Sequence, residues 1–322
     1  AFLCTARRAS GCNLKSDTTL SRKQRKSIRF CGGFFARHTP EKLGRNRKMG
    51  DVIQAKSGDA MLAVLGQTGT LEELKEERIS LQLARGRCYD ILSSAFSYPW
   101  NRKFFRPKSL LEPMDIAIVD EEDWNHVKSI LEGISKYLPK MTVKQAQQEF
   151  IRVFGHAVSM ECPPYEMQYG TEGGIQSQTD VLIQLGGFYE TFGFDQPRNR
   201  TRERVDHISI ELAFMFFMCF RTAFGIQNGH EERNISVLTS SMKKFIRNHI
   251  GRWGPLFCIF TSRKAERGLY KDIVDILAIF LRNESHLLDI NPVKVEEPEY
   301  RSLSYSMEND LVANAPSECE PR

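Results

Sequence analysis

The chain has 322 residues, of which 41% are hydrophobic and 10% aromatic, enough to bury the core of one large domain or two. The formal net charge of +5 is unevenly distributed: residues 1–48 carry 13 Lys and Arg against two acidic residues, whereas the remainder carries 32 Lys and Arg against 38 Asp and Glu. An acidic body does not favour nucleic-acid binding. The eight cysteines contain no C-x-x-C pair, which argues against a zinc or iron–sulfur framework and favours reduced thiols in a cytoplasm.

The first 69 residues are expected to lie outside the folded part. Residues 1–48 lack apolar periodicity and are predicted to be a disordered basic leader, followed by a linker over residues 49–69. The pair Arg7-Arg8 is not followed by an apolar stretch, so it does not form an export signal. Because composition becomes ordinary at Met49, we expect the native chain to start there, without residues 1–48; a basic organellar presequence is the alternative.

Helix signals begin at residue 70. Thr70-Leu-Glu-Glu73 is a capping box, and apolar residues follow at helical spacing until Tyr98-Pro99 ends the run. The stretch from Phe104 to Met114 contains two prolines and is predicted to be a loop. The acidic run at residues 120–123 then opens a helix that Pro139 ends.

A second capping box, Thr142 to Gln145, opens the next helix, and the helical pattern stops after Gly155. The segment from His156 to Gly174 is too rich in Pro and Gly for a helix and too aromatic for a simple linker. Connectors of this length inside a compact chain are often functional. Helical spacing returns over residues 181–192, with Gly193 as the expected end.

The stretch from Arg204 to Phe224 is predicted to be the central helix. Asp206 can cap it, and the residues that follow are apolar on nearly every side, which indicates a helix surrounded by other helices. Its unbroken apolar part, Leu212 to Phe220, is shorter than the about 20 residues that cross a bilayer. The cysteines at positions 88, 219 and 258 sit among apolar residues and are expected in the core.

Two further helices are expected near the end of the chain. Val237 to Trp253 is amphipathic, and Gly254-Pro255 is predicted to end this helix and start another. Tyr270 to Leu281 is the last helix, and residues 284–322 are predicted to be a flexible tail. With no two-residue alternation, the sequence predicts an all-α, single helical-bundle domain of nine or ten helices over residues 70–283.

Common catalytic motifs are missing from the sequence. It contains no phosphate-binding G-x-x-x-x-G-K-[ST] loop, no E-x-x-H pair of the helical di-iron enzymes and no G-x-S-x-G elbow. His207 and Glu211 are four residues apart and can face the same way on a helix. A helical metal-dependent enzyme that uses these two residues is therefore an alternative to a non-catalytic protein.

Five blocks of the sequence, in order, resemble the TorD/DmsD/NarJ family of molybdoenzyme maturation chaperones. The Cys-Pro-Pro-Tyr-Glu form is most similar to the branch that serves respiratory enzymes of the dimethyl-sulfoxide-reductase type, and the resemblance covers about residues 75–283. The blocks are Glu149-Phe-Ile-Arg-Val-Phe-Gly155, Cys162-Pro-Pro-Tyr-Glu-Met-Gln-Tyr-Gly170, Gly187-Phe-Tyr-Glu-Thr-Phe-Gly193, Val205-Asp-His-Ile-Ser-Ile-Glu-Leu-Ala-Phe-Met215 and Phe245-Ile-Arg-Asn-His-Ile-Gly-Arg-Trp-Gly-Pro-Leu-Phe257.

The resemblance implies a cytoplasmic, TorD-like protein that binds the apo catalytic subunit of a molybdenum oxidoreductase. Such chaperones hold that subunit open for insertion of molybdopterin guanine dinucleotide, and many bind its N-terminal twin-arginine leader before release or export. The resemblance implies no catalytic residue, no metal and no permanent cofactor. Weak guanine-nucleotide binding is linked to relatives, although no phosphate loop places it here.

The resemblance also implies which residues bind the leader. In the family an Asp-His pair and an aromatic-Leu-Phe segment are associated with leader binding, and these fall here on Asp206 and His207 and on Phe150, Val153 and Phe154. The chain departs from the family at two of these positions: relatives often carry Trp or Tyr at the position of Phe150 and Leu at that of Val153. The shape of the pocket, and hence the choice of client, is left open.

The chemistry of a leader predicts a similar site. A basic stretch followed by an apolar one calls for carboxylates beside an apolar groove, and bidentate pairing of Arg with a carboxylate would fix its register. Micromolar binding, about −8 kcal/mol, suits a partner that must later be released. The candidate carboxylates are Asp206, Glu211, Glu166 and Glu203, and the candidate groove residues are Phe150, Phe154, Tyr165 and Tyr169, in or near the loop that holds Pro163 and Pro164.

Several interpretations stay open at this point. Phe150, Val153 and Phe154 lie on a stripe typical of a core, whereas Tyr165 and Tyr169 are expected to make surface contacts. Asp206 can also be an N-cap only. A passive scaffold that binds the folded holo-enzyme is a third alternative. The client, its export, and the choice between a monomer and a domain-swapped dimer are not predicted.

Overall fold

The structure is a computed structural model of the 322-residue chain, and it describes residues 70–155, 161–169, 174–195 and 203–297. All of these described residues belong to one compact unit. The predicted basic leader, the linker and most of the predicted tail lie outside the described residues.

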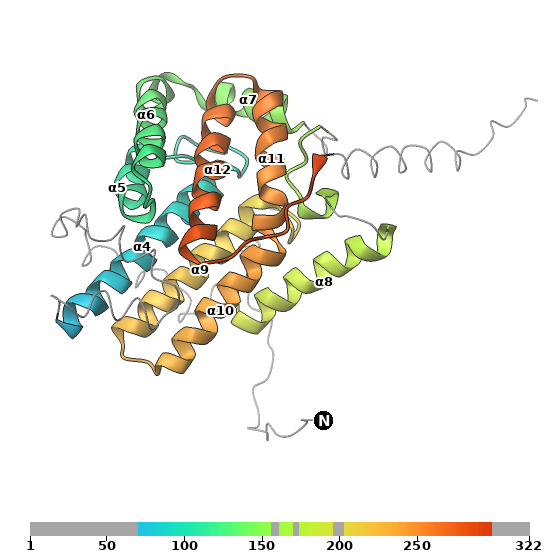
Figure 1. Ribbon diagram of the computed structural model, residues 1–322. Coiled ribbons are helices and arrows are strands. Elements are labelled where there is room, and N and C mark those ends of the chain that lie inside the picture. Colours follow the sequence, from blue (N-terminus) through green and yellow to red (C-terminus); the bar gives the residue numbers. More distant parts are fainter. Residues whose placement is uncertain (1–69, 156–160, 170–173, 196–202, 298–322) are drawn as a thin grey trace, which may run out of the picture. The chain divides into compact units, whose positions relative to one another are not determined.

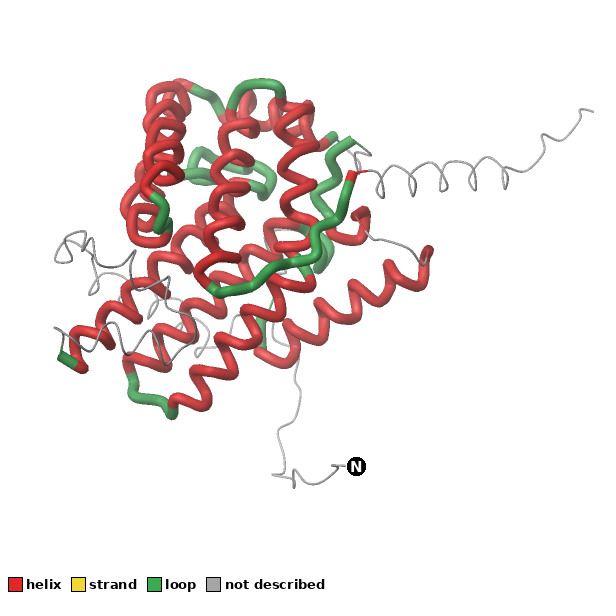
Figure 2. Tube along the Cα trace, viewed as in Figure 1, coloured by secondary structure: helices red, strands yellow, loops and turns green. Residues whose placement is uncertain are grey.

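The described residues form nine α-helices, two short 3-10 helices and no strand, which confirms the predicted all-α class (Figures 1 and 2). The one β-bridge among these described residues is isolated and joins Tyr165 to His207. The helices are α4 (Leu71–Ala95), α5 (Lys108–Ala117), α6 (Glu121–Tyr137), η2 (Leu138–Lys140), α7 (Val143–Phe154), η3 (Glu166–Tyr169), α8 (Gly174–Phe192), α9 (Ile208–Gln227), α10 (Glu232–Asn248), α11 (Ile250–Ala265) and α12 (Leu269–Leu287).

Both predicted capping boxes are present, at the starts of α4 and α7. The Glu73 backbone N–H donates to Thr70 Oγ1 at 3.3 Å, and the Thr70 N–H donates to Glu73 Oε2 at 2.7 Å. Thr142 and Gln145 make the same reciprocal pair. Each box satisfies two donors that have no partner inside the helix, so these two helix starts follow from local sequence.

Helix α9 is the buried centre of the described fold, as predicted. It packs along α4 over much of its length (Figure 1). By length and composition α9 could cross a membrane, but 67% of its most apolar stretch is buried inside the fold. The packing of a core helix therefore accounts for its composition. Its fully buried members include Leu212, Phe214, Met215, Met218 and Cys219.

The predicted loop from Phe104 to Met114 is correct only as far as Pro107, because α5 begins at Lys108 and contains Pro113. A proline inside a helix lacks one backbone hydrogen bond. In α5 this loss is compensated by an apolar face at helical spacing, on which Leu110, Pro113, Met114 and Ala117 are buried. The spacing was a better guide here than the two prolines.

The predicted break at Gly254-Pro255 is also wrong, because the chain breaks at His249, between α10 and α11 (Figure 1). His249 has φ −122° and ψ −110°, outside helical values, and Pro255 lies inside α11. A Cβ added to Gly251 would lie 2.5 Å from the Ile246 carbonyl oxygen. The kink therefore depends on a glycine two residues after the break.

The predicted start of the tail at residue 284 is too early, because α12 continues to Leu287. Glu284 is fully buried and forms an ion pair with Arg85, with Nη2 and Oε2 separated by 2.7 Å. After α12, Leu288, Ile290 and Val295 are buried as well. Residues 288–297, called the closing segment below, therefore belong to the folded part.

Four described cysteines are buried, and they include the three that the sequence places in the core. The fourth is Cys162, whose thiol donates to the Val153 carbonyl oxygen at 3.1 Å. Burial raises the pKa of Cys219 to about 12, so its reactive thiolate form is rare at neutral pH. These cysteines act as small apolar core residues.

Candidate functional site

The Pro-Pro-Tyr-Glu loop is fixed to the start of α9 by backbone hydrogen bonds. The Ile208 N–H donates to the Pro164 carbonyl, and the Glu166 N–H donates to the Asp206 carbonyl, both at 2.9 Å. The rings of Tyr165 and His207 lie 5.0 Å apart between centroids. The structure therefore brings together the two sequence blocks from which the leader site is predicted.

Asp206 is not the N-cap of α9, contrary to one interpretation of the sequence. His207 is the N-cap, because its Nδ1 accepts a hydrogen bond from the Ser209 N–H at 3.2 Å. The Asp206 carboxylate accepts instead from the Met167 N–H at 3.2 Å, at the start of η3. It thus links the Pro-Pro-Tyr-Glu loop to α9, and its side chain is fully buried.

The Asp206 carboxylate is paired with Arg204, a residue that the sequence reasoning did not assign to the site. Arg204 Nε and Nη2 donate to the two Asp206 oxygens at 2.9 and 2.6 Å, and this pairing raises the pKa of Arg204. The guanidinium carbon lies 4.6 Å from the centroid of the Tyr165 ring. The Tyr165 hydroxyl donates to Glu203 Oε2 at 2.8 Å.

We call Tyr165, Glu203 and Asp206 the guanidinium site. Arg204 has a side chain that is 38% exposed, whereas that of Asp206 is 0% exposed. Tyr165 and Glu203 are half-buried. Arg204 therefore lies between the Asp206 carboxylate and the solvent and covers that carboxylate. The only sequence signal for this arrangement is the spacing of Arg204 two residues before Asp206.

Behind the guanidinium site lies a buried polar cluster. Glu166 Oε2 lies 3.0 Å from His249 Nδ1, and the Trp253 Nε1–H donates to Glu211 Oε2 at 3.4 Å. Burial raises the pKa of Glu166. Burial, with the nearby Glu166 as a lesser cause, raises the pKa of Glu211 well above its usual value. In this conformation neither glutamate is open to a partner, so the predicted direct contacts by Glu166 and Glu211 are not available.

Two of the four aromatic residues of the predicted groove, Phe154 and Tyr169, are in the core, and so is Val153. Val153 is 1% exposed and Phe154 is 4% exposed, and both lie in the main hydrophobic cluster. Tyr169, expected on the surface, is 1% exposed and packs on Trp253 with ring centroids 5.1 Å apart. The loop has no periodicity from which its buried side could be read, which is why the exposure of Tyr169 was predicted wrongly.

The remaining groove residues differ in exposure. Pro163 and Pro164 are buried, whereas Phe150 is half-buried and packs against Tyr98 with ring centroids 5.4 Å apart. Tyr98 in turn contacts Trp100, which is 69% exposed. Trp100 is thus a surface aromatic residue next to the predicted groove, and the sequence reasoning did not single it out.

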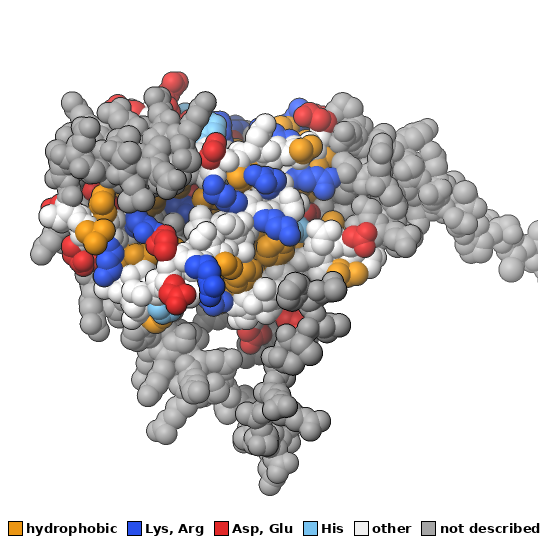
Figure 3. Space-filling model, turned by 60° about the horizontal axis from the view of Figure 1, so that its bottom comes forward, with side chains coloured by type: hydrophobic (Ala, Val, Ile, Leu, Met, Phe, Trp, Pro, Cys, Tyr) orange, Lys and Arg blue, Asp and Glu red, His pale blue; other side chains and the backbone are white. Residues whose placement is uncertain are grey.

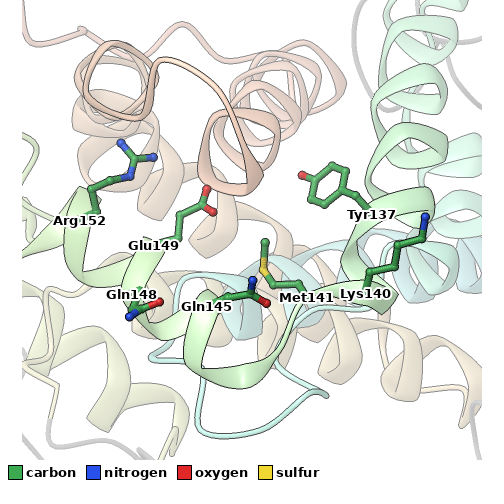
Figure 4. A pocket seen from close by; sticks show the side chains of 7 residues that line it. All are labelled: Tyr137, Lys140, Met141, Gln145, Gln148, Glu149 and Arg152. Carbon is green, nitrogen blue, oxygen red and sulfur yellow. The ribbon is translucent and has the colours of Figure 1, made fainter.

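Two hollows of the described fold have no residue of the guanidinium site in their lining. The first, about 530 Å³, lies between the end of α6, η2 and α7 (Figure 4). Two of its polar groups already have internal partners: Tyr137 donates to Asp272, and Glu149 accepts from the Leu269 N–H. The second hollow has a volume of about 270 Å³. Apolar residues such as Phe104 line part of it, and the basic residues Arg102 and Lys108 line another part.

The surface charge is not uniformly acidic. Figure 3 shows one face of the molecule on which Lys and Arg side chains lie among exposed hydrophobic ones. The excess of acidic residues after residue 48 is therefore not spread evenly over the surface. Recognition of a basic leader would have to rely on particular carboxylates rather than on a general negative field.

The pair His207 and Glu211, considered above as metal ligands, has other hydrogen-bond partners. His207 Nδ1 contacts Ser209 Oγ at 2.7 Å, and Glu211 accepts from Trp253. Within the described ranges, no three His, Cys, Asp or Glu side chains are grouped as ligands of a metal ion. The described geometry gives the metal-enzyme alternative no support.

Comparison with known proteins agrees with the fold and the motifs. Residues 120–259 match the family described as nitrate reductase delta subunit. The perchlorate reductase assembly chaperone protein of Dechloromonas aromatica (strain RCB) is 23% identical over 225 residues, which cover 67% of this chain and 94% of that protein. No solved structure matches the chain.

The all-helical fold and these two matches together support a redox-enzyme assembly chaperone. Both matches support the resemblance of the five sequence blocks to the TorD/DmsD/NarJ family of molybdoenzyme maturation chaperones.

Proposed function

We propose that this protein is a cytoplasmic, client-specific chaperone that binds the apo catalytic subunit of a molybdenum oxidoreductase at its N-terminal twin-arginine-type leader. It assists insertion of molybdopterin guanine dinucleotide into that subunit before release or export, and itself holds no permanent cofactor. The Cys-Pro-Pro-Tyr-Glu form of the loop supports a client of the dimethyl-sulfoxide-reductase type. The name of the perchlorate reductase chaperone supports a respiratory reductase as the client.

The observation that carries this proposal is the guanidinium site itself. A leader arginine needs a carboxylate that accepts a bidentate pair of hydrogen bonds and a tyrosine ring against which the guanidinium can lie. Asp206 and Tyr165 provide this arrangement for Arg204. The proposed contacts are made by Tyr165 and Asp206, with Phe150 on the side of the apolar part of the leader. The other predicted site residues hold these contacts in position because they are buried: Val153, Phe154, Pro163, Pro164, Glu166, Tyr169, His207 and Glu211.

Peptide titration tests the proposed function. The purified chain is titrated with a synthetic twin-arginine leader peptide and with the same peptide carrying two lysines in place of the arginines. We expect micromolar binding of the arginine peptide and at least tenfold weaker binding of the lysine peptide, because lysine cannot form the bidentate pair.

Variants then locate the binding surface. Tyr165→Ala should weaken binding of the arginine peptide about fivefold to tenfold, since it removes the ring beneath the guanidinium. Val237→Ala, at a position 53% exposed on α10, is the control and should leave binding unchanged. Equal binding of the two peptides, or equal binding by the two variants, would contradict the proposed contacts.

A second comparison separates a maturation chaperone from a passive scaffold. The chain is titrated with the catalytic subunit of a molybdenum reductase in its apo form and in its cofactor-loaded form. A maturation chaperone is expected to bind the apo form at least tenfold more tightly, because release must follow cofactor insertion. Equal affinity for the two forms would favour the scaffold.

A further inference from the structure

We infer that Arg204 is an internal substitute for the client's arginine, so that a leader binds by exchange: its guanidinium replaces that of Arg204 on Asp206. This inference rests on the proposed function and adds how access to the site is regulated. The Arg204 guanidinium already makes both contacts that define the site, the bidentate pair with Asp206 and the position over the Tyr165 ring.

Burial of Asp206 makes exchange necessary. Its side chain is 0% exposed, while that of Arg204 is 38% exposed and covers it. A client arginine cannot reach the carboxylate unless Arg204 moves away. A buried carboxylate that loses its partner is strongly destabilised, so the departing guanidinium must be replaced by another cation.

The geometry selects the kind of cation. Two parallel N–H groups meet the two carboxylate oxygens, and a planar group lies over an aromatic ring. A guanidinium group satisfies both conditions, whereas an ammonium group is a point donor that satisfies neither in the same way. The ligand is therefore an arginine side chain and not a lysine.

The position of the site connects its occupancy to the rest of the fold. The Asp206 carboxylate accepts a hydrogen bond from the Met167 N–H, and the Asp206 carbonyl accepts one from the Glu166 N–H. Asp206 therefore fixes the start of η3. Arg204 also accepts a hydrogen bond from the His207 N–H through its carbonyl, at 3.1 Å. Its backbone is therefore fixed by a turn, and the exchange needs movement of its side chain only.

A purely structural role for Arg204 makes a different prediction. In that case the local pair with Asp206 only stabilises the turn, and its removal weakens the fold without creating a site. Under exchange, removal of the Arg204 side chain frees a place that guanidinium compounds fill. Two experiments separate these cases, and the first needs no client.

The first experiment is chemical rescue of Arg204→Ala, read out as the melting temperature. Millimolar ethylguanidinium should raise the melting temperature of this variant by a few degrees, whereas ethylammonium at the same ionic strength should not. The wild-type chain and the double variant Arg204→Ala, Asp206→Asn should not respond. No rise, or an equal rise in the double variant, would overturn the inference.

The second experiment measures the competition directly. If Arg204 occupies the site about nine-tenths of the time, its removal should tighten binding of the twin-arginine peptide roughly tenfold. Arg204→Lys keeps the charge and the fold but cannot form the bidentate pair, and should tighten binding severalfold. Affinity equal to or weaker than wild type in both variants would overturn the exchange. If no form of the chain binds the peptide, the proposed function fails, while the rescue experiment still decides whether the place of Arg204 accepts a guanidinium.

Discussion

At the scale of single residues, His207 combines two tasks that depend on its protonation. Its Nδ1 accepts from the Ser209 N–H and caps α9, which requires that this nitrogen carry no proton. Burial lowers the pKa of the ring to about 4, although Glu203 and Asp206 act in the opposite direction. Glu203 Oε2 lies 3.9 Å from Nε2, and Arg204 adds a positive charge nearby that lowers the pKa further.

The shifted pKa predicts acid sensitivity. Because the folded pKa of about 4 is below the ordinary value of 6.5, this contribution to stability is present above pH 6.5 and is lost as the pH falls toward 4. The shift corresponds to a decrease in the free energy of unfolding on the order of 3 kcal/mol as the pH falls through this range. His207→Asn keeps a capping acceptor without a titrating ring.

We therefore expect His207→Asn to flatten the fall in stability between pH 6.5 and 4. Urea unfolding of the variant and the wild type at several pH values checks this. Parallel pH profiles for the two proteins would show that another group dominates the acid response.

A second prediction at this scale concerns Gly251, after the break at His249. An alanine there would place its Cβ 2.5 Å from the Ile246 carbonyl oxygen and 2.7 Å from the Ile246 Cγ2 atom. Gly251→Ala should cost at least about 2 kcal/mol, because both obstacles belong to a buried residue. Denaturant midpoints measure this cost.

Gly133 in α6 provides the matched control for Gly251. Nothing lies within 4 Å of a Cβ added there, so Gly133→Ala should stabilise the chain by about 0.5–1 kcal/mol. If both substitutions have effects of the same sign and size, the close approach at the kink is not the reason for the glycine.

Part of the site could be predicted at the residue scale. The sequence singled out Asp206, before the apolar helix, and Tyr165, in the Pro-rich aromatic loop, and in the structure both residues contact Arg204. The capping role by which Asp206 was noticed belongs instead to His207. Burial of the loop residues could not be predicted, because the loop has no period. Arg204 was missed because one arginine in a charged loop resembles any solvated residue until the fold places it over Tyr165.

At the scale of elements, α4 and α12 are connected by a fully buried ion pair. Arg85 Nε and Nη2 donate to the two Glu284 oxygens at 2.8 and 2.7 Å, and the Tyr89 hydroxyl donates to the same carboxylate at 2.7 Å. Burial by itself would lower the pKa of Arg85, and the charge of Glu284 more than offsets it, so the pKa is raised.

The Arg85–Glu284 ion pair predicts that the two substitutions will not be additive in a double-mutant cycle. Arg85→Met or Glu284→Leu alone should cost about 3–5 kcal/mol, because each leaves an unpaired charge in the core. The double variant should be more stable than either single variant, since no charge is then left unpaired. Denaturant midpoints of the four proteins measure the coupling. Additive costs would contradict a direct pair.

The helix starts that depend only on local sequence were predicted correctly. Capping boxes are local, so Thr70 and Thr142 mark α4 and α7 correctly from sequence. Pro113 and Pro255 misled because a proline tolerated inside a helix looks the same in sequence as one that ends it. Glu284 was assigned to a tail because its partner, Arg85, is 199 positions away.

At the scale of the whole described unit, one hydrophobic cluster includes side chains from all nine helices and from the closing segment. The closing segment contacts the fold through its backbone as well: the Val295 N–H donates to the Arg252 carbonyl at 3.1 Å. Arg263 and Glu297 also form an ion pair, with Nη1 and Oε1 separated by 2.8 Å. The core is therefore completed by residues that follow the last helix.

Two valines in the closing segment test this contribution, because they differ in burial and not in chemistry. Val295 is 5% exposed and Val293 is 80% exposed. Val295→Ala should lower the free energy of unfolding by about 2 kcal/mol, from two lost methyl groups and the space left behind. Val293→Ala should change it by no more than about 0.5 kcal/mol. Denaturant unfolding of both variants measures the difference, and equal small effects would mean that the closing segment does not stabilise the core.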